Sequence, residues 1–398
     1  METNNSVGYE DDCSLIKMVL VIHDLNQEQW EQFASDYPDC SVISDDQTIS
    51  PCVGCFGCWN KTPGQCVIRD GYGDMGIRIH EADEVVVISK YTFGGFSGFV
   101  KNIFDRSLGY VLPHFEIVNG ESHHKKRYDE DKPFTFIFYG NNLTNEDKNQ
   151  ARRYVLAVCT NIRGHVKDVQ FLNSDYKIVS QVNGVPDMPG KIALINASMR
   201  GKNSNSAKLA SLLTSRLTMR AETFYLSGYL HHMSDLVLSL RDYSTLVLCT
   251  PLYVDGLPSQ MIRFMDSFLK DYNGSQKRVY LLANMGLYES EQLVNLFSAV
   301  RMWTMEMNFD YCGGLGIGAG ELVGGLMEII PYGTWPLGSI AEGLVLLNEA
   351  IGNGTVMEDR YTGPVGFPRA LYIAIANSGW KRMARKNGIR NKDLFRKL

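Results

Sequence analysis

The sequence lacks the marks of a secreted or membrane protein. Its first residues, METNNSVGYEDDCS, are polar and acidic, without the basic start and apolar stretch of a signal peptide. The most apolar late stretch, 322–351, contains Glu328, Pro331, Pro336 and Glu342, so it is not expected to span a membrane. No large basic face is implied either, because the net charge is −5. These absences predict a cytoplasmic protein whose partners are neither membranes nor nucleic acids.

A disulfide framework is not indicated, although the chain contains 9 cysteines. Four of them lie close together in the segment PCVGCFGCWNKTPGQC with the spacing C-x2-C-x2-C-x7-C, namely Cys52, Cys55, Cys58 and Cys66. In a long chain without a signal peptide, this pattern indicates metal or redox chemistry. Three interpretations remain open: a 4Fe–4S cluster, a zinc ion, or reduced or partly oxidised cysteines packed as small apolar side chains.

The order of apolar segments predicts two α/β domains. With 398 residues, the chain exceeds what one hydrophobic core usually covers. Buried-strand runs alternate with helical patterns in each half, which predicts parallel sheets covered by helices on both faces; the runs are 17–25, 82–90, 133–140, 191–198, 244–253 and 277–286. The segment 182–190 has two glycines and two prolines and is expected to be a linker. The predicted domains are therefore 14–181 and 191–398, the second with a C-terminal helical extension.

The two halves also repeat one another. SKYTFGGFSGFVKNIFDR (89–106) and TPLYVDGLPSQMIRFMDS (250–267) both read as a strand end, a tyrosine, a glycine-containing turn and a helix. We interpret this as an internal duplication of one fold.

The turn after the strand at 191–198 is rich in small polar residues. It reads ASMRGKNSNS and contains Ser198, Arg200, Ser204, Asn205 and Ser206 immediately before a helix. A helix N-terminus offers unpaired backbone N–H groups and a positive dipole end, so this turn predicts a phosphate site. The simpler interpretation is an N-capping sequence, because serine and asparagine are favoured caps.

This turn resembles the G-S-P-R-x-x-x-S-N-S/T loop of the NADPH-dependent FMN reductase and flavodoxin-like families, with Ala197 and Met199 as departures. TPLYVDGLPSQM and NMGLYE resemble the second and third flavin loops of those families. The resemblance covers most of 191–320 and implies two tandem flavodoxin-like, doubly wound parallel sheets of five strands. It implies FMN binding by the turn residues named above and by Pro251, Leu252, Tyr253, Val254, Asn284, Met285, Gly286, Tyr288 and Glu289.

The cysteine motif is similar to that of iron–sulfur flavoproteins, and also to a variant found in two-domain flavodoxin-family proteins of anaerobic bacteria. In iron–sulfur flavoproteins the phosphate loop precedes the cysteines in the same domain. Here the corresponding turn, 22–33, has Asp24, Glu28 and Glu31 in place of the polar set. Acidic side chains repel a phosphate, so the first domain is expected to have lost its own FMN site.

The resemblance implies an FMN-dependent oxidoreductase that takes electrons from NAD(P)H and passes them to a small-molecule or protein acceptor, and it implies a homodimer. The alternative is a non-enzymatic electron carrier of the flavodoxin type. No catalytic residue is predicted. His123 and His124, in HHKKRYDED, are expected in an exposed loop, and the tail GFPRALYIAIANSGWKRMARKNG is expected to pack on the second domain or on another subunit.

Overall fold

The N-terminal half of the computed structural model contains a five-stranded parallel sheet. The structure describes residues 17–173, 190–217 and 219–398, so the predicted linker lies outside the described residues except for Gly190. The strand order is β2-β1-β3-β6-β7, with β1 Val19–His23, β2 Ser41–Ser44, β3 Glu84–Lys90, β6 Pro133–Gly140 and β7 His165–Asn173. This is the doubly wound order 2-1-3-4-5 of flavodoxin-like folds.

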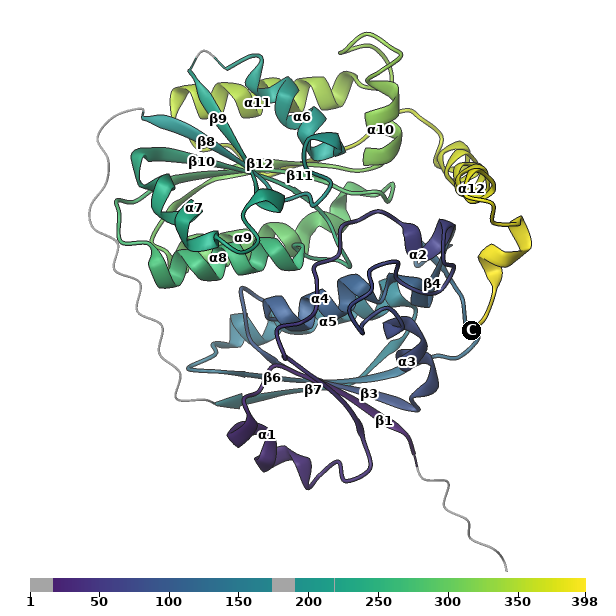
Figure 1. Ribbon diagram of the computed structural model, residues 1–398. Coiled ribbons are helices and arrows are strands. Elements are labelled where there is room, and N and C mark those ends of the chain that lie inside the picture. The colour runs from purple at the N-terminus through teal and green to yellow at the C-terminus, as the bar shows by residue number, and fades with distance from the viewer. Residues whose placement is uncertain (1–16, 174–189, 218) are drawn as a thin grey trace, which may run out of the picture.

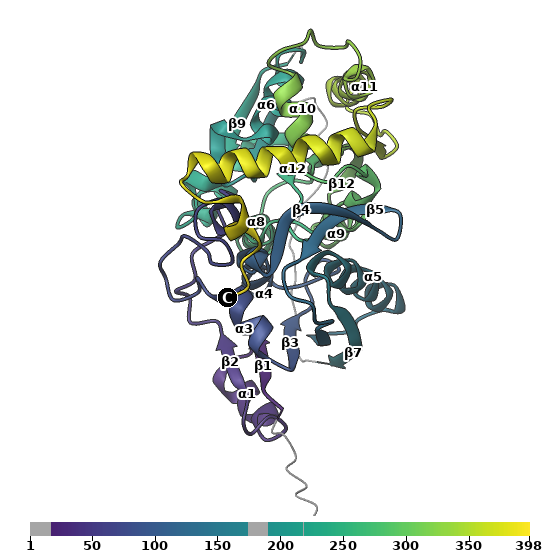
Figure 2. The ribbon, with the colours of Figure 1, turned by 90° about the vertical axis from the view of Figure 1, so that its right-hand side faces the viewer.

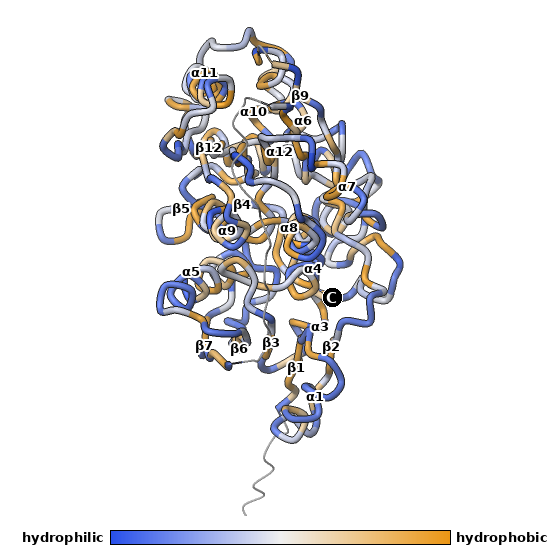
Figure 3. The backbone as a smooth tube through the Cα atoms, turned by 90° about the vertical axis from the view of Figure 1, so that its left-hand side faces the viewer, coloured by the Kyte–Doolittle hydropathy of each residue, from blue (hydrophilic) through white to orange (hydrophobic). Residues whose placement is uncertain are grey.

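Helices cover both faces of this sheet, as its buried, continuously apolar strands require (Figures 1 and 3). They are α1 Gln27–Ala34, α3 Met75–Glu81, α4 Gly98–Arg106 and α5 Asn145–Ile162, while the short α2 Gly57–Asn60 lies in the cysteine loop. Two further strands, β4 Val111–Val118 and β5 Glu121–Lys126, form a separate antiparallel hairpin.

The C-terminal half repeats the same strand order, as the duplication predicts. Its sheet runs β13-β12-β11-β10-β8-β9 and is parallel throughout, with β8 Lys191–Asn196, β9 Ala221–Tyr225, β10 Tyr243–Pro251, β11 Arg278–Asn284, β12 Asp310–Ile317 and β13 Arg360–Thr362. The predicted fold class is confirmed, but this sheet has six strands instead of five. The extra strand, β13, is three residues long and mostly polar, so it carries no apolar run to reveal it.

The helices of the second half are α6 Asn205–Thr214, α7 Met233–Ser239, α8 Ser259–Asp271, α9 Val294–Glu306, α10 Gly320–Leu326, α11 Gly338–Asn353 and α12 Arg369–Lys386. The two sheets lie one above the other, with α4 and α5 facing α8 and α9 between them (Figure 1). Each half has the same small paired turn before its interface helix, Thr92–Gly95 before α4 and Tyr253–Gly256 before α8. No helix in the described ranges is long and apolar enough to cross a membrane.

Helix α12 and the residues after it join the second domain to the first (Figure 2). The Trp380 ring packs edge-on against Trp59 and Phe56 of the first domain, with centroids 5.1 and 5.2 Å away. The buried Arg127 donates hydrogen bonds to the carbonyls of Leu394 and Arg396. The tail therefore packs on the second domain, as the sequence predicts, where Phe367 and Tyr372 enter the core, and its later part also packs on the first domain, which was not predicted.

Asn387 tests how much this docking contributes to stability. Its side-chain amide donates to both the backbone and the side-chain oxygen of Asn60, each at 3.1 Å. We expect Asn387→Ala to lower the free energy of unfolding by about 1–2 kcal/mol, because Asn60 is buried and would lose its donor. Urea unfolding measures this, with Ala at the exposed Asn391 as the control. Equal stability of the two variants would contradict the docking role.

The prediction of an exposed loop at His123 and His124 is wrong. Both lie on β5 and are buried, and the His124 ring packs against Trp59 and Phe115 at 4.5 and 4.8 Å. Burial lowers the pKa of His124 to about 3, so its ring is neutral at physiological pH. The charged neighbours in the sequence suggested a loop, but the hairpin is covered by α12, which lies far away in the chain.

Candidate functional site

A pocket lies at the seam between the two domains. Four segments of the second domain line it, and each lies at the carboxyl end of a strand: the turn after β8, the loop after β10, the loop after β11 and the start of α10 after β12. In open α/β sheets this edge is where ligands bind. The lining residues are Ser198, Arg200, Ser204, Asn205, Ser206, Pro251, Leu252, Tyr253, Asn284, Met285, Gly286 and Glu321, joined by Gly54 and Phe56 of the first domain.

The turn after β8 is built around the start of α6. Ser204 is the N-cap of this helix, and its hydroxyl accepts a hydrogen bond from the Ala207 N–H at 3.0 Å. The capping interpretation is therefore correct for this one serine. Ser206 Oγ donates to the side-chain oxygen of Asn284 at 2.6 Å, which links the first and third loops. The helix still presents the N–H groups of Asn205 and Ser206, which have no intrahelical acceptor at these positions.

The positive charge at this turn is already paired. An Arg200 guanidinium nitrogen lies 2.7 Å from a carboxylate oxygen of Glu321, at the start of α10, and the guanidinium also lies over the Phe56 ring at 5.7 Å. The pair is partly exposed to solvent, so its own contribution to stability is small. Glu321 nevertheless places a negative charge at the site where a phosphate would bind, and it must share Arg200 with that phosphate.

Replacing Glu321 tests this competition. We expect Glu321→Gln to raise the affinity for inorganic phosphate and for FMN by about three- to tenfold, because a partly exposed charge interaction of about 1 kcal/mol is removed. The affinity is measured by titration at low and high salt, and the gain should shrink at high salt. Glu328→Gln is the control, since Glu328, in the turn after α10, pairs with Lys208 of α6 outside the pocket. An unchanged affinity in the Glu321 variant would refute the competition.

The loop after β10 brings Tyr253 against the first domain. A Cβ added at Gly54 would lie only 2.1 Å from the Tyr253 hydroxyl oxygen, so only glycine allows this approach. Gly54 also has φ +62°, a left-handed conformation that glycine adopts without cost. In the third loop, a Cβ at Gly286 would meet nothing within 4 Å, so the backbone there is open toward a ligand.

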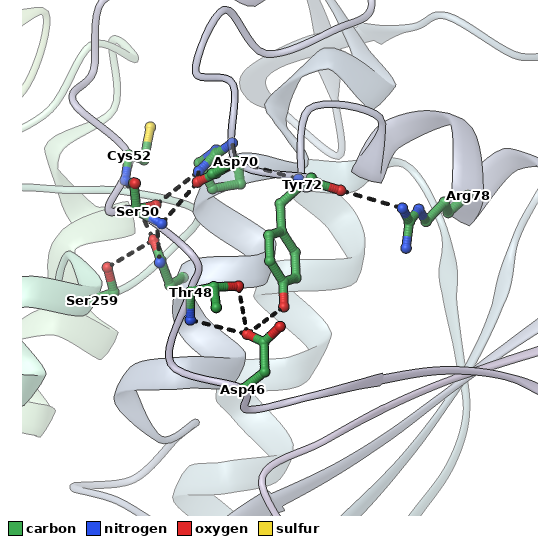
Figure 4. Close-up of polar contacts among 11 residues, drawn as sticks. Asp46, Thr48, Ser50, Cys52, Asp70, Tyr72, Arg78 and Ser259 are labelled. Atoms are coloured by element: carbon green, nitrogen blue, oxygen red, sulfur yellow. Dashed lines mark hydrogen bonds and ion pairs between the residues drawn. The ribbon is translucent and has the colours of Figure 1, made fainter.

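The cysteine loop is fixed to helix α4 by a polar network (Figure 4). Arg106 donates two hydrogen bonds of 2.8 Å to the Asp70 carboxylate and one to the Ser50 carbonyl. Burial opposes ionisation of Asp70, but the bonds from Arg106 and Ser50 prevail and hold its pKa well below its usual value. Asn102 Oδ1 accepts from the Cys52 N–H at 3.3 Å and from Ser259 Oγ at 3.2 Å. The network thus holds the loop in place beside the second domain.

The four cysteines lie near one another, and two of them are strongly perturbed by burial. Burial raises the pKa of the Cys52 thiol to about 12 and that of Cys58 well above its usual value, and neighbouring thiols add to both shifts. Cys55 is exposed, and Cys66 is half-buried. Within the described residues, no group of three or more His, Cys, Asp or Glu side chains is arranged to hold a metal ion. The 4Fe–4S cluster, the zinc ion and the packed thiols all stay predictions.

Three of the residues predicted to contact the flavin do not line the pocket. Val254 packs into the hydrophobic core of the first domain. The Tyr288 hydroxyl donates to the Phe367 carbonyl at 2.6 Å, and Glu289 accepts from the Ser122 N–H at 2.8 Å and from Arg369 at 3.0 Å. Val254 and Glu289 therefore join the two domains, and Tyr288 is held within the second domain, instead of facing the pocket. Conversely, Gly54, Phe56 and Glu321 line it without having been predicted, because nothing local in the sequence relates them to the turn after β8.

In the first domain, Asp24 occupies the turn that corresponds to the phosphate loop. Its carboxylate accepts the Lys90 N–H through both oxygens, at 3.0 and 3.1 Å. Burial raises the pKa of Asp24 to about 6, and hydrogen bonds only partly offset this. The Asp24 carboxylate thus already accepts the Lys90 N–H, which is then not available to a phosphate. This agrees with the expectation that the first domain does not bind a phosphate.

The comparisons with known proteins are partial. No family model matches the chain. Over 62 residues it is 37% identical to an iron–sulfur flavoprotein of Methanocaldococcus jannaschii, a match that covers 16% of this chain and 31% of that protein. Part of this chain is similar to an iron–sulfur flavoprotein. The chain matches about a third of the length of that relative.

Three of the solved structures that resemble the chain each cover less than half of it. The Trp repressor binding protein of Bacillus subtilis is 18% identical, covers 41% of this chain and 95% of its own, and has a TM-score of 0.28. An azoreductase of Bacillus anthracis covers 41% and 99%, at 12% identity and a TM-score of 0.30. An NAD(P)H:quinone oxidoreductase of Methanothermobacter marburgensis covers 43% and 99%, at 14% identity and a TM-score of 0.30.

Proposed function

We propose that this protein binds FMN in the pocket between its domains and acts as an NAD(P)H-dependent oxidoreductase. The observation that carries the proposal is the pocket itself: 11 of the 14 residues predicted for FMN line it, from three separate loops. The donors fit an FMN phosphate, because the start of α6, the Ser198 hydroxyl and Arg200 line the pocket together. The partial relative, an iron–sulfur flavoprotein, adds support.

In this proposal each segment has a defined part. Ser198 and the first N–H groups of α6, including that of Ser206, hold the phosphate, and Arg200 supplies a positive charge. Tyr253 and Gly286 border the space for the flavin ring, and Gly54 and Phe56 close it from the first domain, which excludes water. Bound FMN would supply the hydride-accepting and electron-donating chemistry, which requires no protein acid or base. Burial raises the pKa of the Tyr253 phenol, so it is a neutral ring contact at physiological pH.

Steady-state oxidation of NADH and of NADPH tests the proposal. The protein is loaded with FMN and assayed with a quinone, free flavin and ferricyanide as acceptors. We expect turnover with at least one nicotinamide and one acceptor. FMN binding without turnover would favour the electron-carrier alternative, and no FMN binding would refute both.

The cysteine motif and the oligomeric state call for separate measurements. The 4Fe–4S cluster stays a prediction, and no electron-transfer step is assigned to the cysteines. Iron analysis and a visible spectrum of protein purified without oxygen test it, with a broad absorbance near ~400 nm as the expected signature of a cluster. Light scattering at several concentrations tests the proposed homodimer.

A further inference from the structure

Helix α4 of the first domain holds the Tyr253 loop of the second domain through a buried lysine. Lys101 is 0% exposed, and its ammonium group donates to the Tyr253 carbonyl oxygen at 2.7 Å. Lys132 and Lys277 are also buried and also donate to backbone carbonyls, but each of these two holds carbonyls of its own domain. Lys101 instead reaches from one domain to the other.

Asp105 completes the attachment one helical turn further along α4. Its carboxylate forms an ion pair with Lys101 and accepts the Ser259 N–H at 3.0 Å. Ser259 is the first residue of α8, which begins where the Tyr253 loop ends. The pair therefore holds the loop at both of its ends, at Tyr253 and at Ser259, and both side chains lie on the first domain.

The backbone between these two points is strained. Val254 has φ 39° and Asp255 has φ 54°, two successive left-handed residues that are not glycine. This conformation is unfavourable for a β-branched residue such as valine, where it costs about 1–3 kcal/mol and persists only because the surroundings enforce it. The matching turn of the first domain has Phe93 and Gly94, so glycine relieves its second position. The Val254 side chain is buried in the core of the first domain, which adds a second anchor.

We propose that Lys101 and Asp105 are positioning residues, through which the first domain fixes the flavin-contacting Tyr253 loop and so sets the affinity for the flavin ring. This inference rests on the proposed function, because it assigns a role toward bound FMN. In this proposal the first domain positions the Tyr253 loop whether or not the cysteines hold a metal. Without the clamp, the strained loop relaxes and Tyr253 moves away from the ring space that Gly54 bounds.

The double variant Lys101→Met/Asp105→Asn tests the proposal. It removes both charges together, so no unpaired buried charge is left, and the amide oxygen of the introduced asparagine would still accept the Ser259 N–H. We expect the dissociation constants of FMN and of riboflavin to rise together by about tenfold or more, because a charge-assisted hydrogen bond at the ring loop is lost. A merely structural role would lower the melting temperature without changing flavin affinity of the folded protein.

Lys277→Met is the matched control. It removes a buried lysine of the same kind that holds the Leu240 and Tyr243 carbonyls, which do not line the pocket. Flavin affinity should be unchanged in this variant. A folded double variant that binds FMN within about twofold of the wild type would overturn the positioning role, as would an equal loss of affinity in Lys277→Met. Wild-type protein that fails to bind FMN would refute the proposed function and this inference with it, whereas normal wild-type binding isolates the inference.

Discussion

Asn205→Asp is expected to weaken FMN binding by about a hundredfold or more while leaving riboflavin binding unchanged. Asn205 is the first residue of α6 and lines the pocket. A carboxylate there would face the phosphate dianion. Two unit charges 4 Å apart repel by about 4 kcal/mol at an effective dielectric constant of 20, which more than accounts for the expected loss.

This substitution separates binding from folding. An aspartate in the first turn of a helix interacts favourably with the helix dipole, so the stability of α6 should not fall. Asn203→Asp is the control, because Asn203 is exposed just before the helix and does not line the pocket. Fluorescence titrations with FMN and riboflavin measure both affinities. Equal losses for the two flavins, or a retained FMN affinity, would place the phosphate elsewhere.

Asp255→Asn is expected to stabilise the flavin-free protein at alkaline pH. Asp255 is buried in the Tyr253 loop, and one of its oxygens has no hydrogen-bond partner. Burial raises its pKa from 3.8 to about 7, although Asn161 and Lys101 oppose the shift and Glu121 adds to it. Asparagine has nearly the same shape, also tolerates the left-handed conformation, and carries no charge.

The pH dependence of stability follows from the difference between the Asp255 pKa in the unfolded chain, 3.8, and in the folded protein, about 7. Below pH 4 the carboxyl is protonated in both states, so the wild type and the variant should have similar stability. Between pH 4 and 7 the unfolded chain releases the proton first, so wild-type stability falls by about 1.4 kcal/mol per pH unit. The advantage of the variant should therefore grow to about 4 kcal/mol at pH 7 and then level off.

Urea unfolding at pH 5 and pH 8 measures this difference. Asp168→Asn is the control, because Asp168 is exposed and hydrogen bonds from Gln170 and Val169 lower its pKa. That variant should differ from the wild type by the same amount at pH 5 and at pH 8, because the contribution of a carboxylate with a lowered pKa is lost only below about pH 4. A pH-independent difference between Asp255→Asn and the wild type would show that Asp255 is ionised in the folded state.

Local patterns allowed much of this molecule to be predicted. Runs such as 82–90 and 244–253 are apolar throughout because both faces of a parallel sheet are covered, and they became β3 and β10. The turn at 198–206 was recognisable because its polar residues are adjacent in sequence to a strand end and a helix start. Loops that follow neighbouring parallel strands meet at one edge, so the sequence order also predicted that the other two loops would join it.

Features that depend on distant packing could not be predicted in this way. His124 lies among charged residues, but the hairpin that carries it is covered by α12. Glu321 faces Arg200 only because α10 begins beside α6. From the sequence, Lys101 is only a polar residue on an apolar helix. Its contact with the second domain is known only from the structure, in which its ammonium group lies 2.7 Å from the Tyr253 carbonyl oxygen.

Four features depend on residues that are neighbours along the chain: the strands, their alternation with helices, the duplication and the position of the polar turn after β8. These features could therefore be predicted from the sequence alone. Three others depend on how the chain packs: the cysteine loop closes the pocket, α12 spans both domains, and the first domain holds the strained Tyr253 loop. The physical reason is that these contacts form between surfaces of the two domains, and their geometry depends on how each domain packs.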